Sequence, residues 1–347
     1  MAIAKAVFFG LIITTALQAF AQEETEGGPA VVYEVIYDEP FAVNKLFLHF
    51  QPLYGELFVT NVNVGFGFEA NYFLRDKADF TASLRKTYSA GFFDQVRDQA
   101  LKTSDMDNDP RVLNYYELGG TYHIKDFEMS SRSKIVLYSD SLKGNKWAAQ
   151  VPLDAVIPCK VRKVLGARLG GLFWDSSVDL NRVLESQDLA PADLVDDEGN
   201  TLSSDLNIFS DIVSAGLYAG GSMTWIKNVG VTFDKYDDRV DDMILTTYLD
   251  LIFAPSVELD DVVYTERDTN GAILNTSTYN TDIITIKKVG FRAGVTGKFN
   301  RTMGWAYGIE AGYRPGIESN TFFALVKISI PVFSSSLEYE VESFEGN

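Results

Sequence analysis

The chain has 347 residues and a formal net charge of −18, from 48 acidic against 30 basic residues. Apolar residues make up 46% of it, which is too many for a disordered chain. A single cysteine allows no internal disulfide, and two histidines argue against a histidine-rich zinc site. The acidity argues against nucleic acid as a partner, because neutralising phosphates needs a basic face.

Residues 1–21 have the organisation of a secretory signal peptide. Lys5 supplies the positive charge, residues 6–17 form a short apolar stretch, and Ala19-Phe20-Ala21 matches a small-x-small cleavage site. The apolar stretch is shorter than the ~20 residues of a membrane-spanning helix, although an uncleaved anchor is the alternative. The sequence therefore predicts export, with cleavage after Ala21.

Beyond the leader, no run of ~18 apolar residues predicts a spanning helix. The clearest pattern is an alternation of apolar and polar residues over 57–74 (LFVTNVNVGFGFEANYFL). This stretch is about three times the usual strand length of about 5–6 residues, and it exceeds the ~9–11 residues that cross a bilayer. A polar turn at 75–77 leads into a second alternating stretch at 78–90, which predicts a hairpin of two long strands.

The same alternation recurs along the whole chain. We expect about 14 strands, with 12 to 16 as the range: 44–53, 57–74, 78–90, 112–125, 133–141, 147–157, 160–174, 208–226, 229–234, 243–253, 258–268, 283–299, 303–314 and 320–333. Short turns are expected at 75–77, 126–131, 227–228 and 300–302, and long acidic loops at 91–111, 175–206 and 235–242. Long strands, aromatic residues near strand ends and this alternation of loop lengths favour an all-β, transmembrane, antiparallel up-and-down β-barrel over a soluble sandwich. The strand count should be even if both ends of the barrel lie on the periplasmic side.

The leader, the repeated alternation and the last strand, LVKISIPVF ending at Phe333, resemble those of Gram-negative outer-membrane β-barrel proteins. The tyrosine-rich, acidic composition is similar to that of barrels from Bacteroidetes-type bacteria. The resemblance covers about residues 44–333, between an N-terminal periplasmic segment or plug (22–43) and an acidic C-terminal tail (334–347). It implies an outer-membrane location, contact with outer-membrane lipid and lipopolysaccharide, and insertion by the barrel-assembly machinery.

The inward-facing positions of the predicted strands carry more bases than acids, which suggests a pore lining. The expected lining residues are Arg85, Arg162, Arg168, Lys288, Arg292, Arg314 and Lys327 with Glu69, Glu117 and Glu310, and Lys125, Lys298 and Asp250 share these faces. An excess of bases would make an open lumen favour anionic solutes. In the alternative, the bases pair with the acids and fill the lumen with salt bridges.

Other chemistry receives little support from the sequence. Asp105-x-Asp107-x-Asp109 resembles the start of a calcium loop, but Pro110 stands where that loop needs glycine, so the three aspartates are only a weak metal candidate beside a solvated acidic loop. No carboxylate pair or Ser–His arrangement is singled out, so we expect neither an enzyme nor a cofactor.

The sequence therefore predicts a non-enzymatic outer-membrane barrel, with two open readings of its function. The first is a porin-like channel for small solutes, including anionic ones. The second is a non-conducting structural or accessory barrel that scaffolds a complex with other envelope proteins. A secreted β-sandwich binding protein is a further alternative, and it predicts a soluble mature chain. The fold alone does not choose among them.

Overall fold

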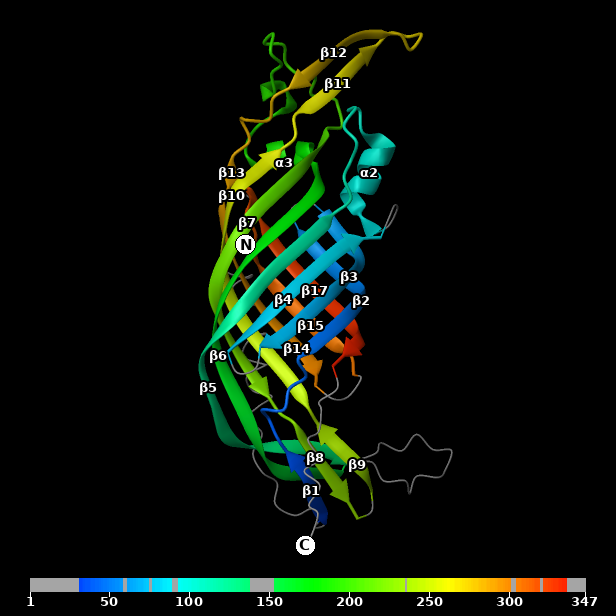
Figure 1. The fold of residues 1–347 in the computed structure, drawn as a ribbon. Coiled ribbons are helices and arrows are strands. Elements are labelled where there is room, and N and C mark those ends of the chain that lie inside the picture. Colours follow the sequence, from blue (N-terminus) through cyan, green and yellow to red (C-terminus); the bar gives the residue numbers. More distant parts are fainter. Residues whose placement is uncertain are drawn as a thin grey trace, which may run out of the picture.

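The computed structural model describes residues 31–58, 61–74, 77–88, 93–137, 153–234, 236–300, 304–318 and 321–335. The predicted leader, its cleavage site and most of the C-terminal tail lie outside these residues. Within them, ten strands close into an antiparallel barrel, in which each strand pairs with the next one along the barrel and the last pairs with the first (Figure 1). The barrel strands are β2 (Leu46–Phe58), β3 (Asn61–Leu74), β4 (Ala78–Thr87), β5 (Asn114–Leu137), β6 (Leu153–Asp179), β7 (Phe209–Ile226), β10 (Met243–Leu259), β14 (Val289–Phe299), β15 (Ala306–Tyr313) and β17 (Phe322–Ser334).

The two ends of the barrel differ. The chain enters the barrel at Leu46 and leaves it at Ser334, and these residues lie at one end, which we call the terminal end. The opposite loop end carries helices and short paired strands (Figure 1): α2 (Gln95–Thr103), α3 (Leu180–Ser186), a 3-10 turn (Pro191–Asp193), β11 (Val262–Arg267) with β12 (Ile273–Tyr279), and β13 (Ile286–Lys287) with β16 (Gly316–Ile317). In the described part of the chain, no helix is both long and apolar enough to span a membrane.

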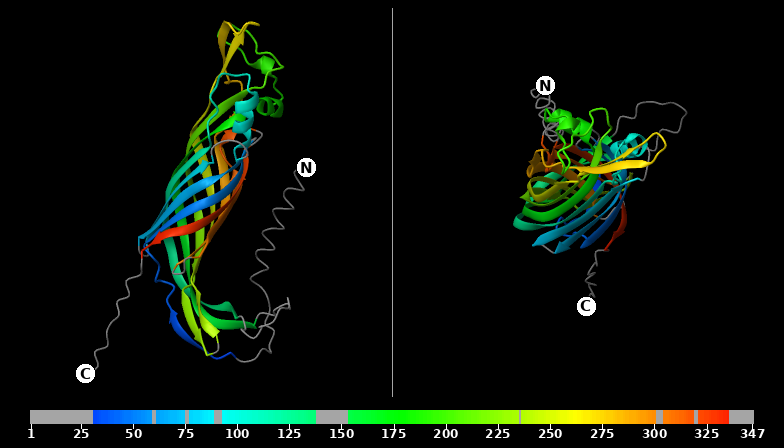
Figure 2. Two further views of the ribbon diagram at one scale, coloured as in Figure 1. Left: turned by 90° about the vertical axis from the view of Figure 1, so that its right-hand side faces the viewer. Right: turned by 90° about the horizontal axis from the view of Figure 1, so that it is seen from above.

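A small two-layer structure projects from the terminal end, and we call it the terminal-end sandwich (Figure 2). One layer is the sheet of β1 (Tyr33–Asp38), β8 (Val229–Phe233) and β9 (Tyr236–Asp241), in the order β1-β8-β9. The other layer is the extension of β5 and β6, which stay paired as far as Leu137 and Leu153. The layers enclose Ile135, Leu137, Ala155, Ile157, Cys159, Val229, Val231 and Phe233.

The all-β fold and the even strand count are confirmed, but the expected number of about 14 barrel strands is wrong. The described residues of the predicted strands 112–125 and 133–141 lie in one strand, β5, apart from 112 and 113, and those of 147–157 and 160–174 lie in β6; residues 138–141 and 147–152 are outside the described chain. The predicted turn at 126–131 lies within β5, where many side chains are exposed on both faces, so polar residues interrupt the alternation without ending the strand. Two more predicted strands, at 229–234 and 258–268, largely leave the barrel as β8 and β11, and most of the expected loop at 235–242 is β9.

The alternation over 57–74 also concealed a strand boundary. β2 continues to Phe58, β3 starts at Asn61, and these two residues pair across the hairpin. The inward side therefore moves from even to odd positions between the two strands, so Phe58 is buried while Val62 is exposed on the outside. The prediction of one strand over 57–74 is wrong, because the composition stays strand-like through the connection. The following hairpin is confirmed by the antiparallel pairing of β3 and β4 up to Leu74 and Ala78, while most of the predicted turn at 75–77 lies outside the described residues.

Candidate functional site

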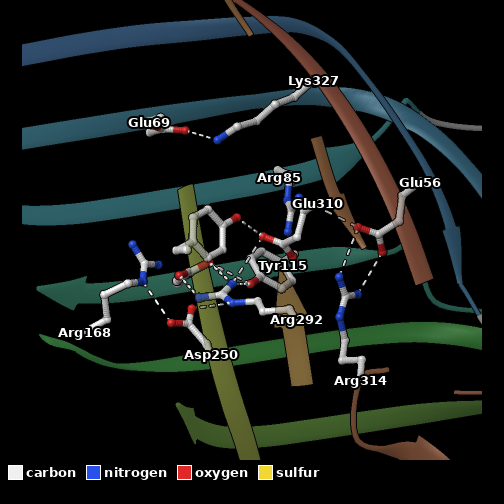
Figure 3. Close-up of polar contacts among 12 residues, drawn as sticks. Glu56, Glu69, Arg85, Tyr115, Arg168, Asp250, Arg292, Glu310, Arg314 and Lys327 are labelled. Carbon is white, nitrogen blue, oxygen red and sulfur yellow. Dashed lines mark hydrogen bonds and ion pairs between the residues drawn. The ribbon is translucent and has the colours of Figure 1, made fainter. Parts of the chain in front are cut away.

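The interior of the barrel holds an ion-pair network centred on Arg292 of β14 (Figure 3). Its Nη2 atom lies 2.6 Å from a carboxylate oxygen of Glu117, and its Nε atom lies 2.9 Å from Asp250. A carboxylate oxygen of Glu310 lies 3.5 Å from Nη1. The Arg292 side chain is only 1% exposed, so one buried guanidinium faces carboxylates from three other strands.

Asp250 connects this centre to a second arginine. Arg168 Nε donates to one Asp250 oxygen at 2.9 Å, while Arg292 Nε donates to the other. Asp250 is fully buried, and a buried carboxylate needs such charged donors to offset its loss of water. The remaining acids of the centre accept hydrogen bonds from tyrosines, Glu310 from the Tyr248 hydroxyl at 2.5 Å and Glu117 from the Tyr115 hydroxyl at 2.8 Å.

Towards the loop end, Glu56 of β2 is shared by two arginines. Arg314 donates to its two oxygens at 2.8 and 3.3 Å, and Arg85 Nη1 lies 3.8 Å away. Both guanidinium groups also lie over aromatic rings, at 4.3 Å from the Phe323 ring centre for Arg314 and at 3.9 Å from that of Tyr115 for Arg85. Cation–π contact and ion pairing together hold these side chains in one place.

Towards the terminal end, lysines replace arginines. Lys327 forms an ion pair with Glu69, which also accepts a hydrogen bond from the Gln51 amide at 3.2 Å. Lys298 donates to the Asn71 side-chain oxygen. The two lysines of this region are therefore also partnered, whereas Gln51 Oε1 is buried without a hydrogen-bond partner in the described chain.

The charges of the described lumen nearly balance. Its bases are Arg85, Arg168, Arg292, Arg314, Lys298 and Lys327, and its acids are Glu56, Glu69, Asp79, Glu117, Asp250 and Glu310. Little remains of the base excess expected from the sequence. The bases alternate in space with the acids, so no ring of charges of one sign forms. The arrangement matches the paired, filled lumen more closely than a basic pore lining.

An apolar layer covers the loop end of this network. Phe58 and Phe323, which point inward from β2 and β17, pack with Trp174 of β6 and with the buried leucines of α3. The Phe58 and Trp174 rings meet edge to face, with centres 4.7 Å apart. The same cluster continues into the loop segments through Leu194, Leu202 and Ile208. The loop-end cap therefore has an apolar core that continues into the barrel.

A second apolar layer lies at the terminal end. Val43, which precedes β2, packs among inward-facing side chains from five strands: Phe47, Phe73, Val164, Ile226 and Ile244. Asparagines hold the segment 39–44 that carries Val43. The Asn228 amide donates to the carbonyls of Glu39 and Ala42 at 2.8 and 3.1 Å, and Asn300 donates to that of Ala42 at 2.6 Å. Part of the segment predicted as a plug thus packs into the mouth of the barrel.

A polar cavity of about 110 Å³ remains between the layers, with His49, Glu69, Thr81, Ser222, Lys298 and Lys327 among its lining residues. Arg85 Nε and one Glu310 oxygen are buried without a hydrogen-bond partner in the described chain, and both residues line this cavity. A cavity of this size and polarity has room for several water molecules. Its lining extends to Phe73 and Ile244, which belong to the apolar cluster around Val43.

The structure gathers eight of the ten expected lining residues into the network and leaves two outside it. Arg162 is buried on the terminal side of the Val43 layer. Its Nε donates to Asp126 at 2.9 Å, and its guanidinium lies 4.7 Å from the Phe41 ring centre. Lys288 lies between β13 and β14 and is exposed. Lys125, on the same predicted face, is also exposed.

The weak metal candidate receives no support from the geometry. Asp105 accepts from the backbone N–H of Asn207 at 2.7 Å, and the N–H of Asp107 donates to the Val263 carbonyl. These contacts hold segment 105–109, which includes Asp109, against neighbouring segments of the loop end. Across the part of the chain that is described, no group of three or more His, Cys, Asp or Glu residues is placed to hold a metal ion.

Sequence reasoning missed Glu56, the acid shared by Arg85 and Arg314. The predicted strand at 44–53 ended before it, and the next predicted strand began after it. Tyr54, Glu56 and Phe58 are all buried on the inward side of β2. The alternation of these three residues could have revealed Glu56, but the predicted strands left 54–56 as a connection.

The outer face of the barrel is apolar and exposed. Leu118, Leu169 and Leu251, from three strands, are 68%, 67% and 68% exposed. Exposed apolar side chains occur on every barrel strand and include Leu57, Phe68, Phe80, Leu217, Val289, Ile309 and Val326. Water-soluble proteins rarely leave so large a continuous apolar surface uncovered.

Neither a scan against known protein-family models nor a search of curated proteins found a match for this chain.

Proposed function

We propose that this protein is a non-conducting outer-membrane β-barrel that anchors its terminal-end sandwich at the periplasmic face and scaffolds an envelope complex there. The observation that carries the proposal is the filled lumen, in which a paired ionic network lies between two apolar layers. Solutes would have to break several buried ion pairs to pass. An open pore instead keeps a hydrated path along its whole length.

The exposed apolar belt supports the membrane location. A closed barrel satisfies its backbone hydrogen bonds internally, and its outward side chains are then free to face lipid. Outer-membrane lipid and lipopolysaccharide are the partners that such a belt implies. The even strand count and the shared position of both barrel termini fit insertion with the terminal end towards the periplasm.

The structure outside the membrane supports a scaffolding role over transport. β5 and β6 have 24 and 27 residues, far more than a bilayer crossing needs, and their extra length builds the terminal-end sandwich. A barrel whose lumen is packed offers its exposed end structures as the places where a partner can bind.

Single-channel recording in planar bilayers tests the proposal. We expect no conductance steps from refolded protein, provided that its barrel migrates as a compact, heat-modifiable species on a gel. Reproducible steps from such protein would overturn the scaffold reading and favour the porin-like channel. A known porin, reconstituted in parallel, shows that the bilayers report insertion.

Flotation with liposomes tests the membrane location separately. We expect the chain without residues 1–21 to float with lipid after refolding and to aggregate without lipid or detergent. A folded monomer that is soluble in plain buffer would contradict the membrane assignment.

A further inference from the structure

In the three-stranded sheet of the terminal-end sandwich, the two edge strands differ in the number of charged side chains. β9 forms one edge and carries Asp237, Asp238 and Arg239. β1 forms the other, and within the described chain no strand pairs with its outer side (Figure 2). Charged side chains on an edge strand discourage pairing with other chains, and β1 carries only two of them, Glu34 and Asp38, against four on β9.

The backbone of β1 leaves hydrogen-bonding groups along this free edge. The N–H of Asp234 donates to the Val32 carbonyl, and Tyr33 pairs with Phe233. Antiparallel ladders direct the backbone groups of alternate residues to opposite sides, so those of Tyr33 and Val35 point away from β8. β1 can therefore accept a further strand through the groups of these two residues.

The side chains of β1 supply apolar contact on both of its faces. Val32 and Ile36 are 63% and 55% exposed, and Tyr33 and Val35 are 37% and 40% exposed. Tyr33 and Val35 lie on the face that packs on the sandwich core, because their partners Phe233 and Val231 are buried in it. An added strand would extend this core past its present edge.

The charge of this region defines the chemistry of the occupant. Residues 31–44 contain Glu34, Asp38 and Glu39 and no lysine or arginine. Asp38 is partly engaged, since both of its carboxylate oxygens accept from the Lys160 backbone N–H, but Glu34 is exposed on β1. A strand with basic residues would match this edge, whereas a second copy would bring Glu34 against an equally acidic edge.

We propose that β1 binds, by strand addition, an extended segment of another envelope protein in which apolar and basic residues alternate. Main-chain hydrogen bonds would supply the affinity, and alternate side chains would supply the specificity. This inference rests on the proposed scaffold function, because it names the partner chemistry for the sandwich that the barrel anchors.

The test uses the refolded chain in detergent and a short synthetic peptide of alternating valine and lysine as the probe. We expect saturable binding, with a shift of isotope-labelled peptide carbonyls to the infrared frequency of a β-strand. The same peptide with an N-methyl group on every residue should not bind, because neither of its edges can complete the ladder. Equal binding of both peptides would show charge attraction alone and would overturn the proposal, as would no binding of the unmodified peptide.

Two matched variants locate the site. Glu34→Lys should weaken peptide binding by about fivefold, the effect of one exposed ion pair, and Asp237→Lys should leave it nearly unchanged. Asp237 is 92% exposed on the β9 edge, so both changes add the same charge to the same sheet. Equal effects of the two variants would refute the β1 site. Dimerisation through β1 in place of peptide binding would overturn the proposed occupant.

Failure of the β1 proposal and failure of the scaffold proposal give different results. Conductance with intact peptide binding would refute the non-conducting barrel and leave the β1 site in place. A silent barrel that binds no peptide would refute the β1 site alone.

Discussion

Replacement of Arg292 by methionine should strongly destabilise the barrel. The guanidinium faces Glu117, Asp250 and Glu310, and the substitution leaves these buried acids with only Arg168 and their hydrogen-bond donors. Removing one member of a buried ion pair typically costs about 3–5 kcal/mol, because the remaining charge is left without its partner. Since three acids share this arginine, we expect Arg292→Met to reach the upper part of that range.

The assay is urea-induced unfolding in detergent, followed by the gel mobility of the folded barrel and by intrinsic fluorescence. Arg239→Met is the matched control, because Arg239 is 4.0 Å from an Asp237 that is 92% exposed. Such surface pairs contribute only about 0–1 kcal/mol. The folded fraction at intermediate urea should therefore fall sharply for Arg292→Met and hardly change for the control.

A second substitution isolates the charge effect. Adding Glu117→Gln to Arg292→Met removes one of the orphaned acids, so the double variant should recover part of the lost stability. If Arg292→Met and Arg239→Met unfold at the same urea concentration, the ion-pair network does not hold the lumen together. If the double variant is less stable than Arg292→Met, the loss does not come from unpaired acids.

Three further predictions concern other parts of the molecule. Gly170→Ala should cost about 1–3 kcal/mol in the same unfolding assay, because its Cβ would lie 2.5 Å from the Tyr218 ring, whereas the neighbouring Gly171→Ala meets nothing closer than 3.6 Å and should be nearly neutral. Cys159 is 5% exposed in the sandwich core and burial raises the pKa of its thiol, so maleimide should label it slowly in the folded protein and fast in urea; equal rates would show that the sandwich is open. Burial also raises the pKa of Asp94, the N-cap of α2, so its contribution to stability is present below its ordinary pKa and is lost as the pH rises through the raised value. Asp94→Asn should therefore flatten that part of the pH dependence of thermal unfolding, and an unchanged slope would show that Asp94 is not its source.

The sequence predicted which side chains face inward much better than it predicted their partners. Alternation placed Arg292 and Glu310 on the inner face, because side chains of a strand point alternately to its two sides. It could not show that Asp250 lies directly opposite Arg292, because this depends on the register between β10 and β14. The excess of bases on the predicted faces disappeared for a different reason, the strand boundaries, since Glu56 lies within β2 and Lys288 lies outside a strand.

The strand count failed where the chain leaves the barrel. Inside the barrel one face of each strand is covered by lumen contacts and the other is apolar, so alternation is regular. In β5 between Asp126 and Arg132, side chains on both sides are exposed or only half-buried, and the pattern fades although the strand continues. The sandwich was not predicted for a related reason, because alternation does not distinguish its strands from barrel strands. The sequence predicted them as further barrel strands or, for β9, as a loop.

The two apolar layers and the ionic network depend on one another. Most charged groups of the lumen are buried between these layers, so they need a protein partner and the two signs must nearly balance. That balance removes the fixed charge on which an anion-selective pore depends. Withdrawing either layer would admit water and weaken the attraction between the ion pairs, because charges interact less strongly at higher dielectric constant. A conducting state would thus sacrifice the contacts that hold the strands of this barrel together, and for this reason we place the function at its ends.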